Sequence, residues 1–101
     1  MGGVAMTPRV LVLHVRKEYF DQIKAGKKKE EYREIKDYWT KRLFMQKYDA
    51  VVIMKGYPKF SEMCEDNCID FLWTGYDVTT IRHKEFGQRP VSVYAIKLVK
   101  E

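Results

Sequence analysis

Three side chains suited to polar chemistry follow one glycine at short spacing. Lys28, Glu31 and Arg33 all lie within seven residues of Gly26. An arginine can grip a phosphate with two parallel hydrogen bonds, and a carboxylate can accept a hydrogen bond from a base amino group. A neighbouring lysine can act as a nucleophile or stabilise an oxyanion. The trio predicts a phosphate and base clamp or a hydrolytic site, and the alternative is a solvated edge strand with internal ion pairs.

Aromatic and histidine side chains supply further candidates for binding. Tyr57 and Tyr76 each follow a glycine, where strands can approach a site closely, so either ring could stack on a base. His83 comes just after a predicted strand and could face a cleft, where a ribonuclease would use a histidine as acid or base. His14 lies in an apolar run and is predicted to be a structural, hydrogen-bonded residue. The predicted binding residues are Lys28, Glu31, Arg33, Tyr57, Tyr76 and His83.

The two cysteines do not match a metal-site pattern. Three residues separate Cys64 from Cys68, and no second Cys or His pair stands nearby to complete four zinc ligands. The acidic residues around them lack the ordered spacing of a calcium loop. We therefore predict an acidic, solvated loop, with no metal and no cofactor. Two cysteines are too few for a disulfide framework, and with no secretory signal in the sequence they predict a cytoplasmic location.

The elements that must position these residues follow from the apolar spacing. Strands are predicted at residues 9–15, 29–35, 48–54, 72–81 and 91–99, and a loop at 59–70. Short helices are predicted at 16–25, ended by Gly26, and at 37–45. This order predicts an α+β fold, a small, partly closed β-barrel of about five to six strands with two short helices near the N-terminal half. Residues 1–8 are predicted to be a flexible leader and 9–101 a single domain.

Charge and composition favour a nucleic-acid or nucleotide partner. The 101 residues carry a net charge of +5. Residues 1–48 hold 12 basic and 6 acidic side chains, whereas residues 49–101 hold 7 and 8. A basic region interleaved with aromatic side chains attracts phosphates and can stack bases. No apolar run approaches the ~20 residues of a membrane-spanning helix, so a membrane partner is not expected.

The segment after Gly26 resembles the G-x-K-x-x-E-x-R signature of the ASCH superfamily, whose members are relatives of the PUA domain. The match consists of Gly26, Lys28, Glu31 and Arg33. The likeness to small bacterial and phage ASCH proteins extends through residues 19–26, 30–33, 38–39, 56–58, 75–81, 83, 86–87 and 90–91, and so over nearly the whole chain. It implies a PUA-like barrel with a cleft beside the first helix. In that cleft the resemblance implies binding of RNA or a modified nucleotide.

The resemblance also implies chemistry for some of these residues. Some ASCH proteins are amidohydrolases that deacetylate acetylcytidine with a lysine, a threonine and a glutamate, and others are described as ribonucleases. Lys28 falls at the lysine position, Glu31 at the threonine position, and Glu85 is the candidate for the glutamate. The catalytic prediction is therefore Lys28, Glu31 and Glu85. Three functions stay open: an RNA- or nucleotide-binding module, a hydrolase of nucleosides or RNA, and a protein-interaction domain of phage origin.

Overall fold

Most elements of the fold follow the apolar spacing of the sequence. The computed structural model describes residues 8–100, so the expected leader lies outside the described residues except for Pro8. The strands are β1 (Val10–Val15), β2 (Glu30–Glu34), β3 (Ala50–Lys55), β4 (Cys68–Leu72), β5 (Tyr76–Ile81) and β6 (Val91–Lys97). The α-helices are α1 (Lys17–Lys24) and α2 (Asp37–Leu43), and two single 3-10 turns are η1 (Phe60–Glu62) and η2 (Lys84–Phe86).

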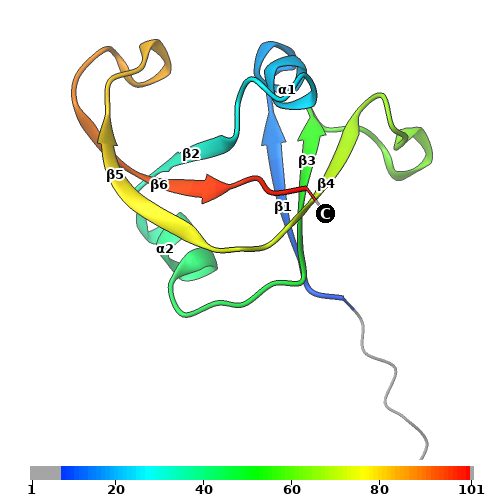
Figure 1. Cartoon of the computed structure of the whole chain (residues 1–101), viewed down its shortest axis with the longest axis horizontal. Helices are drawn as coiled ribbons and strands as arrows, with labels where there is room; N and C mark the ends of the chain where they lie inside the picture. The colour runs from blue at the N-terminus through cyan, green and yellow to red at the C-terminus, as the bar shows by residue number, and fades with distance from the viewer. Residues whose placement is uncertain (1–7, 101) are drawn as a thin grey trace, which may run out of the picture.

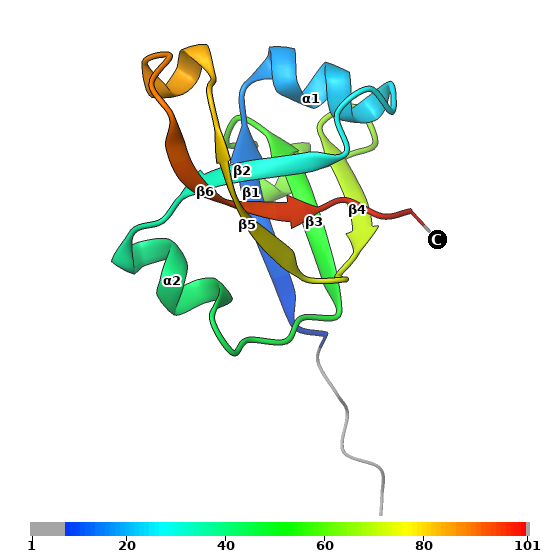
Figure 2. The same ribbon diagram turned by 60° about the vertical axis from the view of Figure 1, so that its left-hand side comes forward.

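The strands form two three-stranded sheets. In the first, β3 lies between β1 and β4, parallel to β1 and antiparallel to β4. In the second, β6 lies between β2 and β5 and is antiparallel to both. Figure 1 shows α1 at one end of the molecule and α2 toward the other, and Figure 2 shows the β2-β6-β5 sheet passing in front of the first sheet. Residues 8–100 thus form an α+β structure of two sheets and two α-helices, without a closed barrel.

The core lies between the sheets because alternate strand residues point inward. In β1 every second side chain is buried, which is the period expected of a strand with one face against a core. Leu13, Ile53 and Ile96 come from three different strands and have no exposed surface. Each such side chain contributes about 1.5–3 kcal/mol when it leaves water. Phe20 and Ile23 of α1 cover one end of this core.

The region after η1 differs from the prediction. The loop predicted at 59–70 contains the start of β4, and the strand predicted at 72–81 is divided between β4 and β5. Ile69 and Phe71 are buried, and Asp70 between them points outward. The charged residue made the alternation of buried and exposed positions hard to recognise in the sequence. Gly75 adopts a φ of +100°, which only glycine takes readily, and the chain passes there from one sheet to the other.

A few contacts join the two sheets at their margins. Leu72 at the end of β4 forms an antiparallel bridge with Val99, which follows β6. At another margin, the Nη2 group of Arg33 on β2 donates to the carbonyl of His14 on β1 at 2.9 Å. The last contact brings β1 and β2 together beside the predicted site.

Candidate functional site

A cavity of about 430 Å³ opens between the two sheets, next to α1. Its walls come from the end of β1, from α1, β2 and α2, from the turn after β3 and from η2. In Figures 1 and 2, α1 and the η2 turn lie at the same end of the molecule, with β2 running below them. A volume of this size is within the range of small-molecule sites. We call this cavity the cleft.

The turn after α1 sets the start of β2. Gly26 has a φ of +76°, and its amide donates to the carbonyl of Ile23. The amide of Lys27 donates to the carbonyl of Gln22 at 2.9 Å, which completes a Schellman-type helix end. This turn leads the chain into β2, where the period of two places Glu31 and Arg33 on one face. The predicted helix stop at Gly26 is confirmed.

Glu31 is the charged centre of the site. It is 8% exposed and is the one buried polar or charged residue within residues 8–100. Its Oε2 atom lies 2.7 Å from Nη2 of Arg33, and its Oε1 atom lies 3.5 Å from Nζ of Lys28. The carboxylate is therefore held between two cations, in an arrangement that fixes both its oxygens.

Burial raises the pKa of the Glu31 carboxyl above its usual value of 4.5. Arg33 and Lys28 favour the ionised form and partly oppose this effect, whereas the nearby carboxylate of Glu85 adds to it. The pKa of the Tyr19 hydroxyl is also raised, first by burial and then by the charge of Glu85. The Glu31 carboxyl and the Tyr19 hydroxyl are thus poorly solvated groups, with which a polar ligand group would interact strongly.

Two buried polar atoms of the cleft have no hydrogen-bond partner. They are the hydroxyl of Tyr19 and the Nε atom of Arg33, and within residues 8–100 no other buried side-chain nitrogen or oxygen lacks a partner. Both residues line the cleft. An unpaired buried polar group costs about 1–3 kcal/mol, so such groups are uncommon unless a ligand or water satisfies them.

Aromatic rings surround this polar centre. Tyr57 stacks on His14, with ring centroids 4.1 Å apart and planes 19° apart, and its side chain is 84% exposed. His14 is hydrogen-bonded through Nδ1 to the carbonyl of Gly56 at 2.8 Å, as expected for a structural histidine, and it also lines the cleft. The ring of Trp39 lies 4.9 Å from the guanidinium carbon of Arg33. Tyr57 therefore presents one open ring face, and it lines the same cavity as the anchored guanidinium of Arg33.

The η2 turn brings Glu85 to the cleft. The Glu85 amide donates to Nδ1 of His83 at 3.1 Å, and Gly87 ends the turn with a φ of +77°. Lys84 lies 3.5 Å from Glu18, an exposed ion pair that links η2 to α1. Glu85 and Phe86 line the cleft, and the charge of the Glu85 carboxylate acts on Glu31.

The predicted residues are divided among three places. Glu31, Arg33, Tyr57 and Glu85 line the cleft. Lys28 and His83 instead line a neighbouring hollow, and Nζ of Lys28 lies 4.4 Å from the centroid of the Tyr32 ring. Lys28 does not line the cleft. The ring of Tyr32 and the carboxylate of Glu31 hold its ammonium group between the cleft and the hollow.

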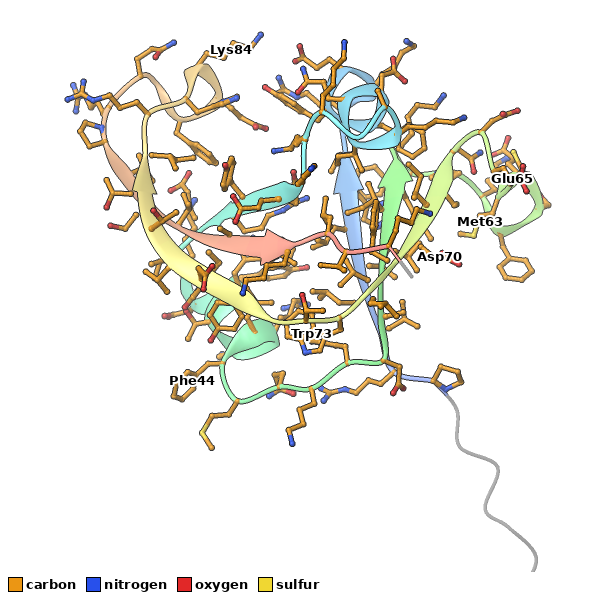
Figure 3. The ribbon with its side chains drawn as sticks, viewed as in Figure 1. Phe44, Met63, Glu65, Asp70, Trp73 and Lys84 are labelled. Carbon is orange, nitrogen blue, oxygen red and sulfur yellow. The ribbon has the colours of Figure 1, made fainter. Side chains whose placement is uncertain are left out.

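The structure does not bring Tyr76 to the cleft. Its ring packs against Trp73 and Tyr94, at centroid distances of 6.5 Å and 5.2 Å, beside the core. Figure 3 shows Trp73 at the opposite end of the molecule from Lys84, which belongs to η2. Sequence reasoning in turn missed the placement of His14, Tyr19 and Trp39, because each has the apolar spacing of an ordinary core residue.

The remaining sequence candidates do not add a second site. Both cysteines are free thiols, Cys64 in the segment between η1 and β4 and Cys68 at the first position of β4. Among residues 8–100, no three His, Cys, Asp or Glu side chains are placed to hold a metal ion. No helix in this part of the chain has both the length and the apolar character to cross a membrane.

Comparisons of the chain with protein-family models, curated proteins and solved structures find no match. The cleft and its chemistry are therefore the basis of the functional argument.

Proposed function

We propose that the cleft binds the base of a nucleotide or of a single-stranded RNA segment. The observation that carries this proposal is the pair of unpartnered buried groups, the Tyr19 hydroxyl and Arg33 Nε, beside the buried Glu31 carboxylate. A planar ligand that both donates and accepts hydrogen bonds would satisfy all three. Nucleobases carry such mixed polar edges on a flat ring.

The polar groups of the cleft suit the edge of a base that carries an amino group. A lone pair of the Glu31 carboxylate accepts from the exocyclic amine, while the Nε–H group of Arg33 donates to a ring nitrogen or carbonyl beside it. A good bidentate pair of this kind discriminates by about 1–3 kcal/mol against the wrong base. The open face of Tyr57 supplies a stacking surface, and stacking contributes about 1–3 kcal/mol per base.

The proposed family assignment agrees with this function. We assign the chain to the ASCH superfamily, with its two sheets as a half-open, PUA-like barrel joined at the Leu72–Val99 bridge. Support comes from the signature residues: Gly26 turns the chain into β2, and Glu31 and Arg33 form the ion pair in the cleft. A short sequence signature is weak support for a family by itself. It is stronger support when its residues also form the polar centre of a cavity.

Binding is tested by titrating the four ribonucleosides and a short single-stranded RNA while following amide and side-chain NMR signals. We expect at least one base to shift the signals of Tyr57, Arg33 and Glu31. The variant Tyr57→Ala should lose about tenfold or more in affinity with little loss of stability, because its ring is exposed. Tyr38→Ala is the matched control, since Tyr38 is also an exposed aromatic residue but does not line the cleft. Equal effects of the two variants, or no shift with any base, would contradict the proposal.

A second candidate is hydrolysis, because two carboxylates, Glu31 and Glu85, line the same cavity. A carboxyl whose pKa is raised can donate a proton, while a second carboxylate activates water. In a deacetylation, water attacks the acyl carbon, the carbon–nitrogen bond breaks and the proton goes to the leaving amine. Incubation with N4-acetylcytidine and with short RNAs, with products separated by mass, tests this function. A hydrolase should lose turnover in Glu85→Gln, and an absence of products from the parent protein excludes the candidate for these substrates.

A further inference from the structure

A second hollow of about 340 Å³ lies directly beside the cleft. Tyr19 and Tyr32 line both cavities, so the two share a wall. The η2 region also borders the two cavities: His83 lines the hollow and Glu85 lines the cleft. A group bound in the hollow would therefore be next to a group bound in the cleft. We call this second cavity the lysine hollow.

The lysine hollow is strongly basic. Three consecutive lysines, Lys27, Lys28 and Lys29, line it, and Glu30 is its one acidic lining residue. Lys27 and Lys29 are exposed, and neither forms an ion pair with another residue of the described chain. Unpaired lysines keep their full attraction for an anion, which is the charge pattern of a phosphate-binding surface.

Lys28 connects the two cavities. Its ammonium group lies 3.5 Å from Oε1 of Glu31, and its side chain is 14% exposed on the side of the lysine hollow. Lys28 is therefore a fixed charge at the boundary between the cavities. It lies between Glu31, which lines the cleft, and the exposed Lys27 and Lys29. A phosphate is joined to its base through one ribose, so a base site and a phosphate site must be neighbours.

We propose that the lysine hollow holds a phosphate attached to the nucleoside whose base occupies the cleft. The ligand class is then a nucleotide or a nucleic-acid strand, rather than a free nucleoside. This inference rests on the proposed function of the cleft. The phosphate has two possible sources, a free mononucleotide or the backbone of a single strand, and both present the same chemistry to the lysines.

The test compares each ribonucleoside with its 5′- and 3′-monophosphates and with a short single-stranded RNA of the same base. The variant Lys27→Gln/Lys29→Gln removes two exposed charges and leaves Lys28 and the cleft unchanged. The matched control is Lys41→Gln/Lys47→Gln, which removes two exposed charges from α2 and the segment after it. Binding constants are measured by calorimetry at several salt concentrations.

We expect at least one phosphorylated ligand to bind parent protein tenfold or more tightly than its nucleoside. The Lys27→Gln/Lys29→Gln variant should lose that gain while binding the nucleoside as the parent does. For RNA, the slope of the logarithm of the binding constant against the logarithm of the salt concentration should become less negative by about 0.7. This is the value for one lost phosphate contact on a single strand. A gain seen only with RNA assigns the phosphate to a strand, and a gain with a monophosphate assigns it to a mononucleotide.

Two failures can be told apart. If nucleosides bind in the cleft but phosphorylated forms bind no tighter, or if both double variants weaken binding equally, the inference is overturned and the proposed function stands. If no nucleoside or nucleotide moves the signals of the cleft, the proposed function fails, and the inference fails with it.

Discussion

At the residue scale, the site depends on a buried carboxylate held between two cations. Glu31 contacts Arg33 and Lys28, and it is also close enough to Glu85 to be affected by its charge. Buried ion pairs often add little net stability, because desolvation offsets the attraction. Here the ion pair positions a side chain: Glu31 holds the Nη2 atom of Arg33, and the Nε atom of the same guanidinium stays buried without a partner.

The pH dependence of stability should reveal this burial. Because the folded-state pKa of Glu31 lies above its unfolded value, folding takes up a proton between the two values. The stabilisation is present below the unfolded pKa and is lost as pH rises through the folded pKa. Glu31→Gln removes the titrating carboxyl, so the variant does not lose this stabilisation. The free energy of unfolding of the variant minus that of the parent should therefore increase as pH rises from 4 to 8. Urea unfolding at each pH measures the difference.

The control for this prediction is Glu65→Gln, which changes an exposed carboxylate in the segment before β4. Its stability difference from the parent should stay nearly constant over the same pH range. A difference for Glu31→Gln that is flat, or that falls with pH, would mean that the carboxyl is not penalised by burial.

At the element scale, two tight turns deliver the site residues. Gly26 ends α1 and aims β2, whereas Gly87 ends η2 after Glu85. The end of α1 could be predicted from the sequence, because an amphipathic helix followed by glycine is a local signal. The start of β4 could not, because Asp70 interrupts its apolar pattern and the buried face becomes evident only when β4 pairs with β3.

Gly26→Ala tests how the turn supports the fold. No atom lies within 4 Å of the position that a Cβ would occupy, so the cost comes from the φ of +76° alone. We expect a loss of about 1–2 kcal/mol in the free energy of unfolding, measured in urea. Gly26→Asn should lose less, because asparagine tolerates the left-handed region better. Equal losses in the two variants would indicate that this conformation is not the source of the cost.

At the scale of the whole molecule, the cleft exists because two sheets meet. His14 and Tyr57 are on or next to strands of the first sheet, whereas Glu31 and Arg33 are on a strand of the second. The sequence predicted the members of the local segment from Gly26 to Arg33, since their spacing in one strand determines their face. It could not predict that Tyr19 and Trp39 join them, because those contacts depend on how the sheets pack, and it predicts Glu85 only through the resemblance to the ASCH superfamily.

Ligand binding should therefore stabilise both sheets together. A ligand at 100 times its Kd adds about 2.7 kcal/mol to the free energy of unfolding when it binds only the folded state. Because the cleft takes one wall from each sheet, the ligand links β1 to β2 and reinforces the hydrogen bond from Arg33 to the His14 carbonyl. Hydrogen exchange should slow in β1 and in β2 by similar factors on addition of the tightest nucleotide. Slowing confined to one sheet would place the ligand elsewhere on the surface, since only a ligand seated between the sheets contacts both.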